Sequence, residues 1–256
     1  MTGFRAAAMA ACLMIVALVV PGTANAGRLE TQTCPTESTR LVVMGDSLAD
    51  GLWGSVFRAF AHCSNVQVVR LTSVSDGLAK SSPEVWLDRY VQEISQSEAI
   101  DIVVVQVGAN DLTAIRDGTT RATYKSDDWH AQYQARTAAL AKALAGRAAT
   151  LIWLGLPVVG RSDLEDAYRE ISAMQAAAVA GSGGSFVDIH GYTQFGAGGF
   201  VMNAEIDGNT ETLRASDQVH FTEIGYDYVA GLLQDDLEKY FSFKSRSAAV
   251  TGAELQ

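Results

Sequence analysis

Runs of apolar residues alternate with amphipathic segments along most of the chain. Five short runs are apolar nearly throughout and end at Gly, Pro or polar residues, which predicts buried β-strands. They cover residues 40–44, 66–71, 102–107, 150–156 and 186–189. Elsewhere apolar residues recur every three or four positions, which predicts α-helices. These helices cover residues 47–60, 83–94, 129–145, 163–180 and 222–240.

The continuous apolar character of the predicted strands indicates how their sheet is packed. Strands that are apolar at nearly every position bury both faces, which is typical of a parallel sheet between two layers of helices. No repeat, linker or change of composition divides the chain. We therefore expect a three-layer α/β/α sandwich with a five-stranded parallel sheet. It would form a single domain over residues 27–243, which begins with a loose polar lead-in over 27–38 and is followed by a flexible tail over 244–256.

The first 26 residues have the order of a secretory signal peptide. A short segment with one positive charge, Met1–Arg5, precedes an unbroken apolar run over 6–20, and the small residues of Ala24-Asn25-Ala26 follow. We expect cleavage after Ala26 and a periplasmic or secreted protein. The alternative is an uncleaved N-terminal anchor, although 15 apolar residues are few for a transmembrane helix.

Composition and charge narrow the range of partners. The chain has 256 residues, is 48% hydrophobic and carries a formal net charge of −10. Without residues 1–26, which hold one Arg and no acidic residue, the net charge becomes −11. An acidic chain without a Lys/Arg cluster is not expected to bind nucleic acid. No second long apolar run follows the first, so we expect no stable membrane association after signal cleavage.

Two cysteines lie beyond the predicted signal peptide, Cys34 and Cys63. Exported proteins meet an oxidising compartment, so we expect a disulfide between them, with two buried thiols as the alternative. Neither a Cys-x-x-Cys pair nor a paired His spacing accompanies them. We therefore predict no metal site.

Candidate catalytic residues are expected just after the predicted strands, because ligands of such sheets bind outside the carboxyl ends of the strands. Ser47 follows the first strand and opens a helix, so its hydroxyl can face that crevice. His220 can accept the hydroxyl proton, and Asp217 can hold the other ring nitrogen. The Asn110 amide and the backbone N–H groups of Ser47 and Gly77 can converge on a developing oxyanion. Gly77 would let the backbone approach the substrate without a Cβ.

The spacing Asp-x-x-His occurs twice, which weakens either pair taken alone. Asp127–His130 lies between the third strand and the next helix, and we interpret it as a cap of that helix. Asp188 and His190 end a strand and have no nucleophile nearby in the sequence, so we interpret them as structural.

Together these residues carry a family resemblance. Gly45-Asp46-Ser47-Leu48, Gly77, Gly108-x-Asn110-Asp111 and Asp217-x-x-His220 resemble in order and spacing the four blocks of the SGNH (GDSL) hydrolases, over about residues 40–235. Further pieces resemble an exported bacterial branch of largely uncharacterised function: Ile115–Gly118, Trp129–Tyr133, Trp153–Pro157 and Leu213-Arg214. The resemblance implies a flavodoxin-like fold, Ser47 as nucleophile, Gly77 and Asn110 as oxyanion donors, and a triad completed by Asp217 and His220.

The resemblance also implies a serine ester hydrolase that needs no cofactor. For an exported enzyme we expect hydrolysis, or transfer, of short acyl esters, in particular O-acetyl groups, on envelope or extracellular glycans. Arg116 and Trp129 are candidate sugar contacts, unless Trp129 packs inward beside a solvated loop. The alternatives are a lipid or aryl esterase of the lysophospholipase or thioesterase type, and a non-catalytic glycan-binding module on the same fold. The sequence does not indicate the oligomeric state.

Overall fold

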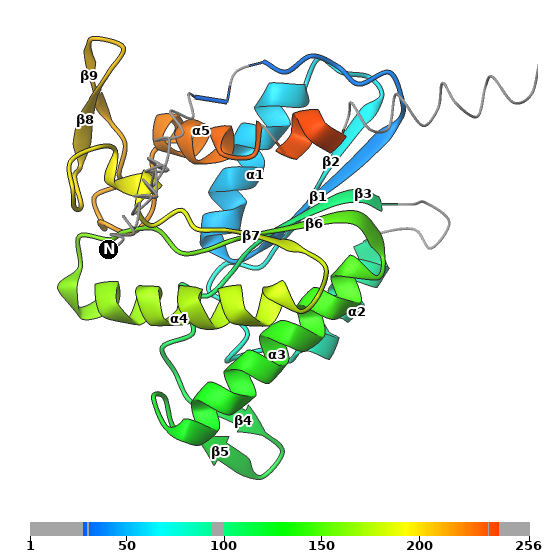
Figure 1. The fold of residues 1–256 in the computed structure, drawn as a ribbon, viewed down its shortest axis with the longest axis vertical. Coiled ribbons are helices and arrows are strands. Elements are labelled where there is room, and N and C mark those ends of the chain that lie inside the picture. Colours follow the sequence, from blue (N-terminus) through cyan, green and yellow to red (C-terminus); the bar gives the residue numbers. More distant parts are fainter. Residues whose placement is uncertain (1–27, 30, 94–99, 235, 241–256) are drawn as a thin grey trace, which may run out of the picture.

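Five parallel strands form the central sheet in the order β2-β1-β3-β6-β7 (Figure 1). They are β1 (Thr39–Gly45), β2 (Val66–Thr72), β3 (Ile100–Gln106), β6 (Ala148–Leu154) and β7 (Ser185–Val187). The structure is a computed structural model that describes residues 28–29, 31–93, 100–234 and 236–240. The predicted signal peptide and the predicted tail over 244–256 lie outside these residues. The α/β class and the five-stranded parallel sheet are confirmed.

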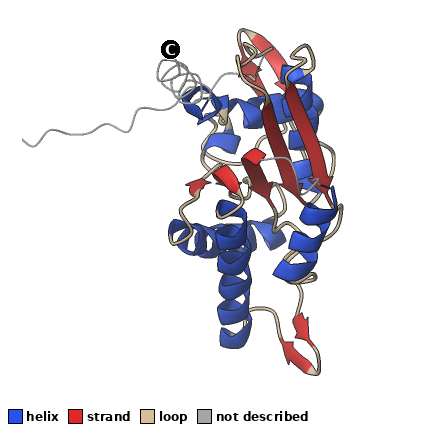
Figure 2. Cartoon of the chain, turned by 90° about the vertical axis from the view of Figure 1, so that its right-hand side faces the viewer, coloured by secondary structure: helices blue, strands red, loops and turns tan. Residues whose placement is uncertain are grey.

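Helices cover both faces of this sheet (Figures 1 and 2). One face carries α1 (Ser47–Phe60) and α5 (Glu223–Gly231), and the other carries α2 (Pro83–Glu93), α3 (Asp127–Ala145) and α4 (Ser162–Ala180). In the described part of the chain, no helix is long and apolar enough to cross a membrane.

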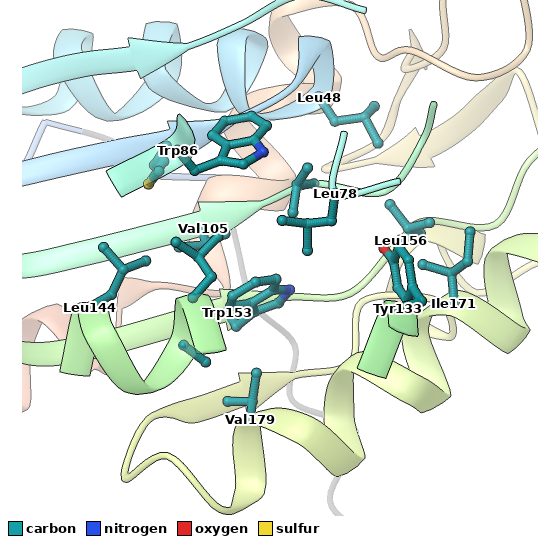
Figure 3. Close-up of a cluster of buried hydrophobic side chains, with 14 of the residues drawn as sticks. Leu48, Leu78, Trp86, Val105, Tyr133, Leu144, Trp153, Leu156, Ile171 and Val179 are labelled. Atoms are coloured by element: carbon teal, nitrogen blue, oxygen red, sulfur yellow. The ribbon is translucent and has the colours of Figure 1, made fainter. Parts of the chain in front are cut away.

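Alternate residues of the strands supply two separate cores, which explains why the strands are apolar throughout. Leu41 and Val43 of β1 pack with α1 and α5, whereas Val42 and Met44 pack with α2, α3 and α4. Successive side chains of a strand point to opposite faces of the sheet. Figure 3 shows the second core, in which Trp153 of β6 lies among side chains of the neighbouring elements.

Two short hairpins and a turn of 3₁₀-helix are present that the apolar pattern does not predict. The first hairpin is β4 (Ile115–Asp117) with β5 (Thr120–Ala122), the second is β8 (Asn203–Ile206) with β9 (Asn209–Thr212), and the 3₁₀ turn covers Tyr192–Gln194. Their strands have three or four residues and are largely exposed, so they carry no long apolar repeat. The Asp-Gly turn of the second hairpin, with both residues at positive φ, is a recognisable hairpin signal.

The ends of the domain differ from the prediction. The last helix, predicted over 222–240, ends at Gly231 and resumes after a turn at 232–233. The lead-in is not loose: Leu29 is buried in the core, its N–H bonds to the Asp227 carbonyl, and the Gln32 N–H bonds to the Ala59 carbonyl. The first residues of the domain are therefore fixed against α1 and α5.

The predicted disulfide between Cys34 and Cys63 is present, with the two Cα atoms 5.4 Å apart. It joins the lead-in to the chain just after α1. The two cysteines are 29 residues apart in sequence, so the bridge restricts a sizeable loop of the unfolded chain.

Replacing both Cys34 and Cys63 by Ser should lower the free energy of unfolding by about 3 kcal/mol, because the unfolded chain regains the freedom of that loop. Urea denaturation of the oxidised wild type and of the double variant measures the difference, and wild type treated with dithiothreitol should behave like the variant. Equal midpoints and slopes for all three samples would contradict a stabilising bridge.

Candidate active site

The strand-to-helix turn after β1 presents Ser47 at the first position of α1. Gly45 makes this turn possible: its φ is +146°, and a Cβ there would lie 1.8 Å from the Gln106 carbonyl oxygen. The next residue, Asp46, caps the helix by accepting the Leu48 N–H at 2.9 Å. Ser47 therefore lies at the positive end of the helix dipole, with its side chain half-buried.

Asp217 and His220 lie on the turn that precedes α5, and they meet Ser47. The Nε2 of His220 is 2.7 Å from the Ser47 hydroxyl, and its Nδ1 is 2.6 Å from Oδ2 of Asp217. Oδ1 of the same carboxylate accepts the backbone N–H groups of Val219 and His220, each at 3.0 Å. The three predicted triad residues are thus brought together from opposite ends of the sequence.

The electrostatics of Asp217 suit an orienting carboxylate. Partial burial by itself would raise its pKa, but the hydrogen bonds from Val219 and from the ring and backbone of His220 hold the pKa of Asp217 below its ordinary value. An ionised carboxylate accepts a proton-bearing Nδ1, which leaves Nε2 as an acceptor toward the Ser47 hydroxyl. The geometry therefore suits proton transfer from serine to histidine.

Arg214 supports the turn that carries this histidine. Its side chain is buried, with the guanidinium carbon 3.9 Å from the centre of the Phe221 ring. Nη1 donates to the Val219 carbonyl at 3.0 Å, and Nη2 donates to the Val158 carbonyl in the loop after β6. Burial lowers the pKa of Arg214 to about 10, which leaves it cationic at neutral pH. The sequence pointed to Arg214 only through the resemblance and gave it no role.

The carboxylate of Asp46 links the serine turn to the loop that carries Asn110. Its Oδ2 accepts the N–H groups of Gly108 and Ala109, both at 3.0 Å. Asn110 follows directly, half-buried, and its Nδ2 donates to the Asp76 carbonyl at 3.1 Å. The loops after β1, β2 and β3 therefore converge at one place on the carboxyl edge of the sheet.

A second buried carboxylate, Asp111, fixes the loop after β2. It accepts the N–H groups of Leu78 and Ala79 at 3.1 and 2.9 Å, and the Tyr133 hydroxyl at 2.8 Å. That hydroxyl in turn accepts a bond from Gln175 of α4 at 3.1 Å. Sequence reasoning missed Tyr133 and Gln175 as parts of the site, because a single polar residue within a helix carries no spacing signal.

Gly77 lies in this loop, but its structural role differs from the predicted one. Its N–H donates to the Asp76 carboxylate at 2.8 Å. A Cβ at Gly77 would lie 2.0 Å from Oδ1 of Asp111. The space that the glycine leaves is thus occupied by a carboxylate of the protein and not by an approaching substrate. The predicted reason for a glycine here, room for an approaching substrate, is therefore wrong, while the role of its N–H as an oxyanion donor stays a prediction.

The two candidate sugar contacts, Arg116 and Trp129, are not beside the triad. Trp129 is fully buried, stacks on Tyr133 with ring centres 4.9 Å apart, and donates its Nε1–H to the Thr113 carbonyl at 2.8 Å. A buried ring cannot contact a ligand, so the inward-packed alternative holds. Arg116 lies on the β4–β5 hairpin, which projects from the far end of the molecule from α1 (Figure 1).

The other described histidines pair with carboxylates or lie at the surface. His130 bonds to Glu170 at 2.8 Å, and Ser126, not Asp127, caps α3. His190 bonds to Glu165 at 2.5 Å. His62 comes close to Cys34 and Cys63, where three ligand atoms lie within 4.8 Å. The two sulfurs are joined in the disulfide, so they are not thiolates available to a metal.

Solved structures with esterase and lipase names share this fold. A GDSL-like lipase from Bacteroides thetaiotaomicron matches with a TM-score of 0.52 and 18% identity, over 79% of this chain and 89% of its own. A putative acylhydrolase from Bacteroides fragilis matches with a TM-score of 0.54 and 16% identity, over 83% of this chain and 92% of its own. A catalytic mutant of an acetylxylan esterase from Geobacillus stearothermophilus matches with a TM-score of 0.51 and 13% identity, over 77% of this chain and 94% of its own. At these identities the likeness concerns the fold, which is that of the SGNH hydrolases.

The family itself follows from the sequence match. Residues 40–236 match the family described as "Protein of unknown function (DUF459)", and the chain belongs to it. The comparison with curated proteins gives no match.

The buried carboxylate of Asp46 should make stability depend on pH. Burial raises its pKa from the ordinary 3.8 to about 7, although backbone N–H groups act against this. The folded protein then holds this proton more tightly than the unfolded chain, so the stabilisation is complete below about pH 4 and is lost as the pH rises through about 7, at up to about 1.4 kcal/mol per pH unit. Burial also raises the pKa of Asp111 to about 6, so this group likewise stabilises the fold less as the pH rises.

Replacing Asp46 by Asn, which does not titrate, should therefore flatten the fall of the unfolding free energy between pH 5 and 7, measured by urea denaturation. Asp76→Asn is the matched control. Burial alone would raise the pKa of Asp76, but bonds from Arg89, Gly77 and Ser81 hold it below its ordinary value, so the slope in this range should not change. An Asp46→Asn variant with the wild-type slope would show that Asp46 does not titrate there.

Proposed function

We propose that the protein is a serine ester hydrolase that removes, or transfers, short acyl groups from glycans outside the cytoplasm. The observation that carries the proposal is the His220 ring, which bridges the Ser47 hydroxyl at 2.7 Å and the Asp217 carboxylate at 2.6 Å. A serine, a base and an orienting carboxylate in hydrogen-bonding contact form the arrangement that activates a serine nucleophile. A non-catalytic binding module would not need this contact.

The reaction would follow from these contacts. Oγ of Ser47 attacks the ester carbonyl carbon while Nε2 of His220 takes the hydroxyl proton, and Asp217 remains ionised and stabilises the imidazolium. The tetrahedral intermediate collapses, the C–O bond to the alcohol breaks, and His220 gives its proton to the leaving alkoxide. Water or a sugar hydroxyl, deprotonated by His220, then attacks the acyl-serine and releases the acyl group.

Two donors are suited to hold the oxyanion. The Ser47 N–H lies at the N-terminus of α1. The Asn110 amide has two N–H groups, so it can keep its bond to the Asp76 carbonyl and still donate the second to an oxyanion. Gly77 has a single N–H, which the Asp76 carboxylate takes, so it would join only by giving up that bond. We therefore assign the hole to Ser47 and Asn110.

The proposed substrate class rests on location, charge and relatives. The signal-peptide pattern and the disulfide favour the periplasm or the exterior. A net charge of −10 disfavours anionic lipid surfaces. The side chains of Asp217 and His220 are 50% and 34% exposed, so a polymer can reach the triad. One structural neighbour is named as an acetylxylan esterase, and we propose O-acetyl groups of glycans as the substrate here.

Substitution of Ser47 or His220 by Ala should reduce hydrolysis of 4-nitrophenyl acetate at least about a thousand-fold, because the triad acts as a unit. His130→Ala is the matched control: it also lies in an Asp-x-x-His sequence, but its ring bonds to Glu170, so activity should remain. Thermal unfolding of each variant checks the fold. Esterase activity that survived Ser47→Ala would reject the proposal. Preference for octanoyl over acetyl esters in the wild type would favour the lipid esterase alternative.

Asn110→Ala should lower kcat for the same ester about 10²- to 10³-fold, with KM little changed, because the oxyanion forms only in the transition state. Steady-state kinetics measure both constants. Ser73→Ala, in the same group of loops, serves as the control for general disturbance. An Asn110→Ala variant with wild-type kcat would remove Asn110 from the oxyanion hole.

A further inference from the structure

A cavity of about 490 Å³ lies between the lead-in, the β8–β9 hairpin and α5, apart from the triad. Figure 1 shows the hairpin projecting beside α5, with the lead-in passing nearby. The hairpin contributes Ile206, Asn209 and Glu211 to its lining, and α5 contributes Ile224 and Tyr228. We call it the hairpin cavity.

The register of the hairpin directs one of its faces at this cavity. Ile206 is paired with Asn209, and Ala204 with Glu211. Directly opposed residues of an antiparallel pair point to the same side, and neighbours along a strand point to opposite sides. The intervening pair, Glu205 with Thr210, therefore faces away.

The walls of the hairpin cavity are held in place by bonds between the elements that form it. Arg28 of the lead-in pairs with the buried Asp227 of α5 at 2.8 Å, and Asp227 also accepts Arg58 of α1 at 2.6 Å. The Thr222 hydroxyl, at the start of α5, donates to the Thr212 carbonyl of β9 at 2.7 Å. A binding site that is already ordered without its ligand loses less conformational entropy when the ligand binds.

The chemistry of the lining indicates the kind of ligand. Asn209, Glu211 and Asp207 offer amide and carboxylate groups that bond to hydroxyls, and Tyr228 adds an aromatic side chain. The basic side chain that the described lining contributes, Arg28, is paired with Asp227. The carboxylates of Asp207 and Glu211 therefore disfavour an anionic ligand, and the mixture suits a neutral polyhydroxyl compound.

The hairpin cavity is also connected to the catalytic turn. Ile224 lies in the first turn of α5, four residues after His220, and Glu211 lies three residues before Arg214. Two lining residues are therefore close in sequence to the turn that carries His220. We propose that the hairpin cavity binds neutral sugar units of a glycan chain next to the acylated unit. This inference rests on the proposed function and specifies its substrate.

The test measures binding of unesterified sugars, which needs no catalysis. Calorimetry with neutral hexasaccharides of xylose, glucose and N-acetylglucosamine, and with an oligogalacturonate of the same length, gives the affinities. We expect at least one neutral hexasaccharide to bind and the oligogalacturonate not to bind. Glu211→Ala and Asn209→Ala should each weaken that binding about three- to ten-fold, as expected for the loss of hydrogen bonds.

Glu205→Ala is the matched control, since it removes the same charge from the opposite face of the same hairpin, and its affinity should equal that of the wild type. Absence of binding by every neutral hexasaccharide, or equal losses in Glu211→Ala and Glu205→Ala, would overturn the inference. Failure of the proposed function would appear separately, as a wild-type protein that does not hydrolyse 4-nitrophenyl acetate. Glu205→Ala should keep that hydrolysis, while the KM of Glu211→Ala for the acetylated form of the bound hexasaccharide should rise by the same factor as its dissociation constant.

Discussion

The buried carboxylate of Asp46 fixes the two segments from which the site is built. One oxygen caps α1, and the other receives the N–H groups of Gly108 and Ala109. Because β1 and β3 are adjacent parallel strands, their carboxyl ends lie side by side, and a single side chain can span both. Ser47 follows this carboxylate by one residue, and Asn110 follows Ala109 by one. The proposed nucleophile and the proposed oxyanion donor are thus positioned by one shared group.

Burial of an ionised carboxylate is energetically unfavourable, and hydrogen-bond donors around the buried carboxylates offset part of this energy. Desolvation raises the pKa of both Asp46 and Asp111, and the two carboxylates also repel each other. Each carboxylate receives three hydrogen bonds. One of those to Asp111 comes from the Tyr133 hydroxyl, which itself accepts a hydrogen bond from Gln175 of α4. The helix layer on one face of the sheet therefore determines where the loops lie at its edge. Asp217 also accepts three hydrogen bonds, but its side chain is half exposed and its pKa is held below the ordinary value.

Features that depend on residues near each other in the sequence could be predicted, and most features that depend on contacts between distant residues could not. The strands could be predicted from continuous apolar runs, which are local signals. The contact of Ser47, His220 and Asp217 could be anticipated from the order of the four blocks, because the topology of a parallel sheet brings strand ends together. The roles of Gly77 and Trp129 could not be decided from the sequence, because they depend on partners far away in the chain. A glycine that makes room for Asp111 and a glycine that makes room for a substrate look the same in a sequence. Likewise, a Trp in a polar stretch gives no sign that its Nε1–H bonds to the Thr113 carbonyl, 16 residues away.

The β8–β9 hairpin leads directly into the turn that carries His220, the proposed base. The Thr222 N–H bonds to the Leu213 carbonyl at 3.1 Å, and the Leu213 N–H bonds to the Met202 carbonyl at 2.9 Å. Arg214 then ties the same segment to the Val219 and Val158 carbonyls. The hairpin, the base turn and the loop after β6 are therefore one hydrogen-bonded unit. The proposed ligand of the hairpin cavity would contact the same hydrogen-bonded unit that positions His220, so the proposed recognition of the glycan and alignment of the base would share their supports.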